Sequence, residues 1–356
     1  MHLNDGTIPE DYLKYTGKKI SVILGGFILL LITLIMAISL GPVNIPPLDV
    51  IVTIFGSNVS DQFTAIIWNN RIPQALTAIV AGAALAVSGV AMQSILRNPL
   101  GSPFTLGISH AAAFGAAFSV IVLGAGTMQS TGVNSIVISN PYVTTTVAFI
   151  FSLLSTAVIL LISKIRRASP EVMVLAGVAI GSLFTAGTMF LQYFADDVQL
   201  AAVVFWTFGD VGRANWNELM IMGILTGLAI IYFVYNCWNY NAIDAGDETA
   251  KGLGVNVERL RLVGMIVASM ISAVVVGFLG IIGFVGLVCP HMMRRIIGDD
   301  HRFLIPGTIV AGGILLLASD TAARMILAPH VLPVAILTAF MGAPVFIYLL
   351  VRGYAK

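Results

Sequence analysis

IPQALTAIVAGAALAVSGVAMQSI, residues 72–95, is a 24-residue run that contains no Asp, Glu, Lys or Arg. As an α-helix it would be about 36 Å long, which is enough to cross a hydrocarbon core of roughly 30 Å. Ala78, Gly82 and Ala86 recur every four residues and therefore share one face of that helix. Such spacing of small residues is typical of membrane helices whose backbones pack closely together. The run predicts a transmembrane helix inside a bundle.

Comparable apolar runs recur along the whole chain, which is 58% hydrophobic and only 10% charged. Lipid cannot satisfy free backbone polar groups, so the repetition indicates an all-α integral membrane protein. Nothing in the sequence resembles a linker, and residues 1–356 are interpreted as a single transmembrane domain. The ten candidate spans are 20–40, 72–95, 104–124, 143–163, 172–192, 216–236, 262–282, 284–297, 303–325 and 331–351.

Positive charge is unevenly distributed between the segments that join these spans. With the N-terminus inside, fifteen of the eighteen Lys and Arg fall in inside segments, and only Arg71, Arg213 and Arg324 fall outside. The positive-inside rule then predicts that both termini are cytoplasmic. Residues 1–19 become a cytoplasmic leader, because the run at 20–40 is too long and too apolar for a cleaved signal peptide. Segments 41–71 and 125–142 become external loops.

Several chemistries find no support in the sequence. There is no G-x-x-x-x-G-K-[ST] loop to hold ATP, and no Cys or His pair has metal-ligand spacing. Cys237 and Cys289 are interpreted as free core thiols, and the five histidines as packing or interface residues. We therefore expect neither a cofactor, a resident metal nor a nucleic-acid partner. No carboxylate falls near a predicted midplane, and Asp320 and Arg324, four residues apart, are expected to pair.

The fifth candidate span carries a stripe of small and polar residues along one helix face. Its members are Gly177, Gly181, Thr185, Thr188 and Gln192. Such a stripe is able to line a translocation path, since it offers hydrogen bonds without charged ligands. Close helix packing selects the same residue types and is the alternative interpretation.

The charged inside segment 241–261 is the best candidate for binding a partner. Asp247 is expected to cap a short helix that contains Glu248 and Lys251 and that ends at Gly252 or Gly254. Asn256 is expected to cap the helix that follows. A short charged helix at the membrane surface is something a soluble motor could push, whereas a solvated loop is the alternative.

Four stretches together resemble one family over essentially the whole chain. They are RIPQALTAIVAGAALAVSGVAMQSILRNPLGSPFTLGIS (71–109), GDETAKGLGVNVERLR (246–261), GFVGLVCPHMMRRIIGDDHRFLIPG (283–307) and SDTAARMILAPHVLPVAILTAFMGAPVFIYLL (319–350). Their order and content resemble the permease family of iron-chelate and vitamin B12 ABC importers.

The resemblance implies a homodimer with ten helices per subunit and a path along the dimer axis, lined by the fifth helix. It also implies two cytoplasmic ATPase subunits, which bind the ATP and Mg, and an external solute-binding protein. The family's coupling segment matches Asp247–Gly254, and its cytoplasmic gate matches in part Asn98, Pro99 and Leu100. Pro170 and Glu171 stand at the other part of the gate, where the family has a small hydroxyl pair.

Two external arginines, Arg71 and Arg324, match positions that pair with the binding protein in the vitamin B12 permease, while Gln74 replaces a third arginine. The expectation is therefore a multi-pass permease of the cell membrane that imports a ferric siderophore, haem or a corrinoid and is not itself an enzyme. Uptake of an oxyanion such as molybdate is the alternative within the family. A carrier driven by an ion gradient is the alternative outside it, and would have no need of segment 241–261.

Overall fold

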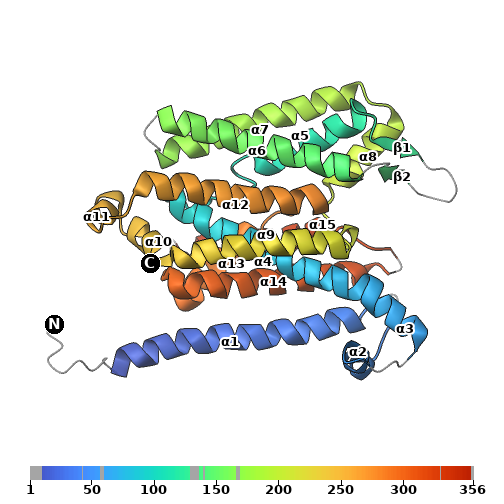
Figure 1. Ribbon diagram of the computed structural model, residues 1–356, viewed down its shortest axis with the longest axis horizontal. Coiled ribbons are helices and arrows are strands. Elements are labelled where there is room, and N and C mark those ends of the chain that lie inside the picture. Colours follow the sequence, from blue (N-terminus) through green and yellow to red (C-terminus); the bar gives the residue numbers. More distant parts are fainter. Residues whose placement is uncertain are drawn as a thin grey trace.

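The computed structural model describes residues 10–41, 43–56, 60–128, 136–138, 141–165, 169–328 and 330–353. Over these residues the chain forms a bundle of helices that run roughly along the long axis of the molecule (Figure 1). The described helices are α1 (Glu10–Ser39), α2 (Pro47–Ile54), α3 (Asp61–Ile66), η1 (Ile67–Arg71), α4 (Ile72–Ile95), α5 (Ile108–Ile121), α6 (Pro141–Ile165), α7 (Pro170–Tyr193), α8 (Asp197–Thr207), η2 (Val211–Arg213), α9 (Trp216–Tyr235), α10 (Cys237–Asp244), α11 (Asp247–Gly252), α12 (Val257–Leu279), α13 (Val285–Ile297), α14 (His301–Ile326) and α15 (Val334–Gly353). Strands β1 (Gly126–Met128) and β2 (Ile136–Ile138) form a short antiparallel pair.

Each of the ten predicted spans coincides with a helix. Seven of the described helical segments are long and apolar enough to cross a membrane, so the chain is an all-helical, multi-pass membrane protein apart from the short strand pair. The remaining predicted spans fall on α5, α13 and α15, and α5 and α13 are short, with 14 and 13 residues. The predicted span 104–124 begins only at Ile108, because residues 98–107 form turns. The predicted external loop 41–71 is not irregular throughout, since it contains α2 and α3.

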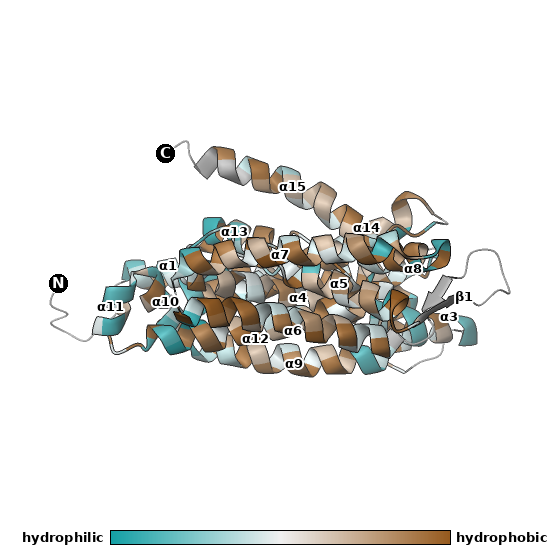
Figure 2. Cartoon of the chain, turned by 90° about the horizontal axis from the view of Figure 1, so that it is seen from above, coloured by the Kyte–Doolittle hydropathy of each residue, from teal (hydrophilic) through white to brown (hydrophobic). Residues whose placement is uncertain are grey.

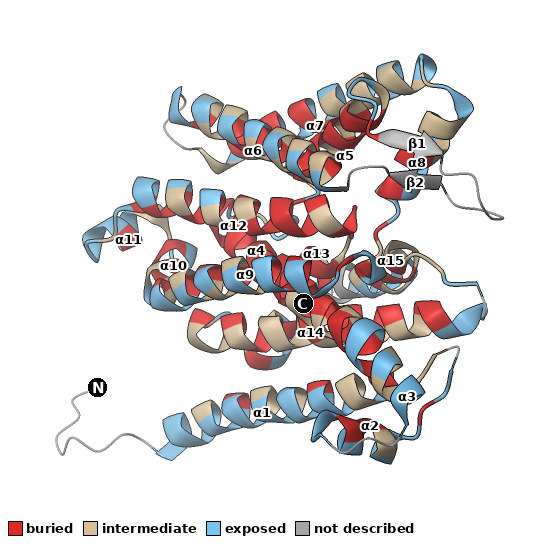
Figure 3. Ribbon diagram, turned by 45° about the vertical axis from the view of Figure 1, so that its right-hand side comes forward, coloured by how far each residue is buried: buried red, intermediate tan, exposed pale blue. Residues whose placement is uncertain are grey.

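The helices are arranged in a row across the molecule, with α4 at its centre. Helices α5, α6 and α7 pack together at one side, followed by α12, then α4 with α9 and α13 beside it, then α14, and finally α1 (Figure 1). Buried residues concentrate on α4 and α12 in the middle of this row, whereas α1 is exposed over most of its surface (Figure 3). Helix α15 contacts α13 and α14 and leans away from the rest of the bundle (Figure 2).

Small residues allow α4 to occupy this central position. Ala78 and Ala86 are fully buried, and Gly82 lies against the backbone of Gly312 on α14. Seven residues further along, Gly89 lies against the backbone of Gly286 on α13. The packing role predicted for the small-residue face of 72–95 is therefore confirmed.

The two ends of the bundle differ in content. Helices α10 and α11 lie at one end, together with the start of α1 and the C-terminal end of α15 (Figure 1). We call this the α11 end. Helices α2 and α3 and the strand pair lie at the opposite end, which we call the α2 end. Hydrophilic residues gather at both ends and hydrophobic residues lie between them, as expected for a bundle that crosses a bilayer (Figure 2).

Candidate functional site

A cavity of about 480 Å³ lies between the start of α5 and the middle of α7. Its walls come from the turn at 104–107, from His110 in the first turn of α5, and from one side of α7 between Gly177 and Met189. No side chain that lines it is charged. The cavity therefore suits a bulky solute that passes without tight ionic binding.

The predicted stripe on α7 contributes to this cavity only in part. Gly177, Gly181 and Thr185 line the cavity, but Thr188 and Gln192 do not. The two glycines also pack tightly against the segment that leads into α5, since a Cβ on Gly177 would lie 2.9 Å from Leu106 Cα. The packing interpretation therefore holds for Gly177 and Gly181, which are buried in this contact.

The open face of α7 is rotated away from the predicted stripe. Val178 and Met189, 57% and 64% exposed, line the cavity together with Ser182 and Ala186, which are also exposed. These residues, rather than Thr188 and Gln192, line the cavity. The hydroxyl groups of Thr185 and Thr188 donate to Gly181 O and Phe184 O of their own helix, each at 2.9 Å.

The turn predicted to form part of the gate follows directly from α4 and is tightly held. Asn98 Oδ1 accepts a hydrogen bond from Leu100 N at 2.9 Å, which is the geometry of an Asx turn. Pro99 O contacts His291 Nε2 of α13 at 2.8 Å. Arg97 enters the turn with φ +45°, a left-handed backbone conformation that is strained for a residue with a side chain. Strain of this kind concentrates at functional sites, and the gate role of the turn stays a prediction.

Pro170 and Glu171, predicted at the other part of the gate, begin α7 at the α11 end. Glu171 accepts a hydrogen bond from Ser169 Oγ. Within the described part of the chain no hydrogen bond or ion pair joins Glu171 to the turn at 97–100. The structure thus shows the two predicted halves of the gate on separate elements, without direct polar contact.

Helix α11 confirms the short charged helix predicted at 247–252, but Asp247 does not cap it. The residue before the helix is Gly246, and Asp247 is the first helical residue. Its carboxylate instead accepts two hydrogen bonds from Arg261 of α12, Nη1 to Oδ2 and Nη2 to Oδ1, both 2.8 Å long. The Asx-cap prediction failed because a buried guanidinium, only 4% exposed, competes for the same oxygens. The cap predicted for Asn256 is confirmed, since its Oδ1 accepts from Arg259 N at 2.9 Å.

The outer surface of α11 is open. Glu248 is 90% exposed at its side chain and pairs with Lys251 at 3.0 Å. Leu253, just after Gly252, is 70% exposed, and the following Gly254 has φ +82°. Figure 3 shows α11 projecting beyond the rest of the bundle. A charged helix with an exposed leucine at its tip is a suitable docking surface for a soluble protein.

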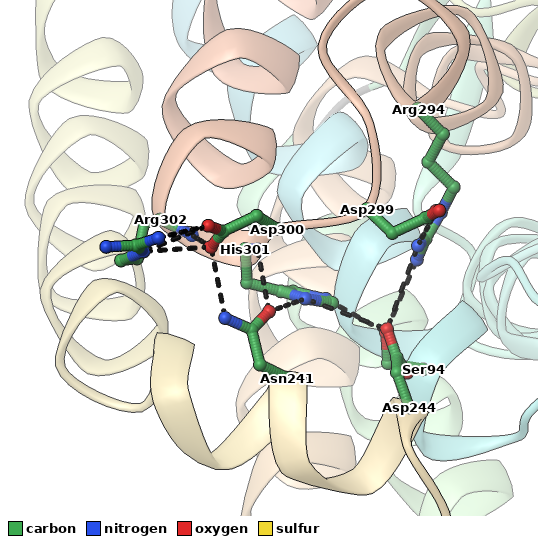
Figure 4. Close-up of polar contacts among 8 residues, drawn as sticks. All are labelled: Ser94, Asn241, Asp244, Arg294, Asp299, Asp300, His301 and Arg302. Carbon is green, nitrogen blue, oxygen red and sulfur yellow. Dashed lines mark hydrogen bonds and ion pairs between the residues drawn. The ribbon is translucent and has the colours of Figure 1, made fainter. Parts of the chain in front are cut away.

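A polar cluster that was not singled out in the sequence joins four helices at the α11 end (Figure 4). At its centre is His301, 1% exposed, whose Nε2 lies 3.0 Å from Ser94 Oγ and whose Nδ1 lies 3.0 Å from Asn241 Oδ1. Since the amide oxygen only accepts, the proton belongs on Nδ1, and His301 Nε2 and Asp244 Oδ2 share the single hydroxyl proton of Ser94, at 3.0 Å and 3.3 Å. Arg294 bonds Asp299 at 2.9 Å and lies 3.7 Å from Asp244. The cluster fixes the ends of α4, α10, α13 and α14 relative to one another.

Asp244 is a largely buried carboxylate that lies next to Arg294 in this cluster. Burial raises its pKa, and the nearby Arg294 and the hydrogen bond from Ser94 act in the opposite direction. A second carboxylate, Asp300, receives hydrogen bonds from Arg302 and Asn241. The third of the four quoted stretches, 283–307, contains His301 and Arg294, whereas Ser94, Asn241 and Asp244 come from distant parts of the sequence.

The three arginines predicted to lie outside all bind main-chain carbonyl groups at the α2 end. Arg71, 6% exposed, donates to Ile38 O at 3.2 Å, to Val43 O at 3.0 Å and to Leu40 O. Arg324, 5% exposed, donates to Ala37 O at 3.1 Å. In the same way Arg213 donates to three carbonyls at the end of α8.

The match of Arg71 and Arg324 to docking positions stays a prediction, and in this structure neither side chain is open to solvent. Both guanidinium groups are buried against the C-terminal turn of α1, whose carbonyls lack helical partners. The predicted ion pair between Asp320 and Arg324 is confirmed at 3.1 Å, and Gln74 donates to the same carboxylate at 3.0 Å. Direct pairing of the two arginines with a docked protein would require them to leave these carbonyls.

The bundle, its uncharged cavity and the projecting helix α11 define a membrane transport subunit. Similarity to known proteins gives its family. The profile of the FecCD transport family matches residues 29–352. The chain belongs to this family. A protein of Methanocaldococcus jannaschii assigned as an ABC transporter permease is 55% identical over 353 residues, which cover 98% of this chain and 99% of the relative.

Two further similarities agree with this assignment. The hemin transport system permease protein HmuU of Yersinia pestis is 36% identical over 328 residues, covering 92% of this chain and 95% of the relative. A solved structure described as an inward-facing conformation of an ABC transporter assigned to the metal-chelate type superposes with a TM-score of 0.81, at 28% identity, over 93% of this chain and 99% of that one. The chain is therefore an ABC transporter permease, a transport subunit and not an enzyme. ATP hydrolysis is carried out by separate ATPase subunits.

Proposed function

We propose that this permease imports a metal chelate, such as haem, a corrinoid or a ferric siderophore, which an external solute-binding protein delivers. The proposed transporter is a homodimer whose subunits each cross the cell membrane ten times, with the α11 end in the cytoplasm. The start of α1 and the C-terminal end of α15 lie toward the α11 end, which supports cytoplasmic termini (Figure 1). The hemin permease and the metal-chelate transporter among the similar proteins support the class of cargo.

The observation that carries the proposal is a continuous connection from α11 to the cavity. Asp247 binds Arg261, and its Oδ1 lies 3.6 Å from Arg97 Nη1 in the gate turn. Arg261 Nε donates to Ile95 O at the end of α4, at 3.2 Å. Beyond the gate turn the same segment continues to Phe104 and Thr105, which line the cavity. A displacement of α11 that moves Arg97 is therefore only seven residues along the chain from the cavity wall at Phe104.

In the mechanism we propose, two ATPase subunits dock on the exposed surface of α11. ATP binding draws these subunits together and moves α11, and the Asp247 contacts transfer this motion to the turn at 97–100. The turn and the start of α7 at Pro170 and Glu171 then act as the inner gate. Cargo released by the binding protein enters from the α2 end and passes along the open face of α7.

Transport by the reconstituted complex tests this proposal. The permease, its ATPase partner and its binding protein would be placed in lipid vesicles, and ATP-dependent uptake of radiolabelled cobalamin, haem and a ferric siderophore would be followed. Glu248→Arg reverses a charge on the proposed ATPase surface and is expected to abolish uptake. Glu10→Arg makes the same change on an exposed residue of α1, 88% exposed at its side chain, and is expected to leave uptake unchanged.

Two results would contradict the proposal. Uptake that continues without ATP and follows an imposed ion gradient would make the protein a secondary carrier. Uptake of molybdate in preference to all three chelates would keep the ATP-driven mechanism but replace the cargo by an oxyanion.

A further inference from the structure

One polar side chain in the cavity has no partner. His110, in the first turn of α5, lines the cavity, and its Nδ1 is buried without a hydrogen bond. Among the described residues no hydrogen bond reaches either ring nitrogen of His110. Nδ1 faces α7, because a Cβ placed on Gly181 would lie 3.5 Å from it. Nε2 is the other ring nitrogen and the one left for a molecule in the cavity.

The position of His110 deep in the bundle makes a ring nitrogen without a hydrogen bond energetically unfavourable. Gly181 is the twelfth of the 24 residues of α7, about 17 Å along the helix from its first residue. The imidazole therefore lies near the middle of a helix that is long and apolar enough to cross the membrane. A polar group without a partner is unfavourable in such surroundings, and polar groups retained inside membrane bundles generally mark a site of function.

The rest of the cavity wall is apolar or already hydrogen-bonded. The Phe104 ring lies 4.8 Å from the His110 ring, between centroids. Val178 and Met189 provide exposed apolar surface on α7. Ser182 Oγ donates to Val178 O of its own helix at 3.0 Å. The wall thus combines hydrophobic surface with one available nitrogen ligand. A metal macrocycle offers the complementary groups, an apolar ring and a metal that accepts an axial ligand.

We infer that His110 Nε2 is an axial ligand for the metal of the cargo as it passes. The cavity then favours flat chelates with an exchangeable axial position, as in haem and corrinoids, over siderophores whose donor atoms saturate the metal. The step is a ligand exchange: the Nε2 lone pair replaces an axial water, the proton stays on Nδ1, and no electron is transferred. This inference rests on the proposed function and narrows its cargo.

A single ligand suits a transporter. Within the described residues no group of three or more His, Cys, Asp and Glu side chains is placed to hold a metal ion. A bare ion would therefore find no binding site here, whereas a chelate brings its other ligands with it. One metal–nitrogen bond orients the macrocycle in the cavity and still lets it leave.

Spectroscopic titration of the full-length permease in lipid nanodiscs tests the inference without ATP. The probes are ferric protoporphyrin IX, aquocobinamide and ferrichrome. With the wild type, we expect the absorption and paramagnetic spectra of haem, and the absorption of cobinamide, to change to those of an imidazole-ligated metal, while ferrichrome stays unchanged. His110→Ala should abolish that spectral change and weaken the binding of both macrocycles about tenfold or more. His110→Met should give haem a thioether-ligated spectrum, and His330→Ala, at an exposed site after α14, should behave as wild type.

An imidazole-type spectrum that persists in His110→Ala, or that is absent in the wild type, would overturn the inference. ATP-driven uptake in vesicles, measured separately, shows whether the proposed transport function is also wrong. A wild type that transports a chelate with ATP but gives no spectral change would retain the function and lose the axial ligand.

Discussion

Gly89 of α4 and Gly286 of α13 touch backbone to backbone. A Cβ on Gly89 would overlap the Gly286 carbonyl and would lie 2.8 Å from Gly286 Cα. Neither backbone is able to yield, because α4 is buried on nearly all sides. The contact is therefore a fixed point between the helix that leads into the gate turn and the helix that carries His291.

Gly89→Ala is expected to lower the free energy of unfolding by about 3 kcal/mol, as overpacking of a tight core does. Gly223→Ala in α9 is the matched control, since nothing lies within 4 Å of the position its Cβ would take. The control should change stability by less than about 1 kcal/mol. Thermal unfolding in detergent micelles, followed by circular dichroism, measures both. Equal stability of the two variants would show that α4 and α13 are free to separate.

The sequence was sufficient for the membrane helices because the physical signal is local. An apolar run of some twenty residues has few alternatives to a membrane helix, and each of the ten predicted spans coincides with a helix, seven of them in segments long and apolar enough to cross a membrane. Helix α8 was missed for the converse reason. It has 11 residues, too few to span a bilayer, and is defined by a capping box between Asp196 and Gln199 and by packing against α5.

The functional surfaces were harder to predict because they join separate helices. The stripe on α7 was identified from one helix alone, which does not tell which face meets α5. His110 was interpreted as a packing residue, since only the contact between α5 and α7 brings it to the cavity. Asp247 was assigned to a local cap, whereas Arg261, fourteen residues later, binds it. In each case a contact between distant residues overrode a correct local rule.

Arg71→Gln should destabilise the isolated permease, because the buried carbonyls at the end of α1 would lose a charged donor. A loss of about 1.5–3 kcal/mol is expected for hydrogen bonds to a charged group. Arg259→Gln changes an exposed arginine at the α11 end and is the control. The measurement is thermal unfolding in the absence of any binding protein. Unchanged stability combined with weaker docking of the binding protein would instead assign Arg71 to the docking surface.

Asp300 should make stability depend on pH in the acid range. Burial acts to raise its pKa, but hydrogen bonds from Arg302 and Asn241 outweigh burial and lower the pKa to about 2, from 3.8. Because the folded-state pKa is depressed, this contribution is present in full above about pH 4 and is lost as the pH falls toward 2. Asp300→Asn should therefore be less stable than wild type at pH 6, with a difference that shrinks below pH 4.

Unfolding temperatures of the two proteins at pH 6, 5, 4 and 3 check this expectation. Asp11→Asn, an exposed change in the first turn of α1, serves as the control and should follow the wild type throughout. A constant difference between Asp300→Asn and wild type at all four pH values would contradict the pKa-based explanation.

Asp247→Asn should uncouple ATP hydrolysis from uptake. The variant keeps α11 but gives up the two-point ion pair with Arg261, so the motion of α11 would no longer be transferred rigidly to α4 and the gate turn. In vesicles we expect near-normal ATP hydrolysis and a several-fold lower ratio of cargo imported to ATP hydrolysed. Arg261→Lys should behave similarly, because a lysine cannot form the paired hydrogen bonds of a guanidinium. If both variants import cargo at the wild-type ratio, the coupling runs through other contacts of α11, and Glu248→Arg would then interfere with ATPase docking alone.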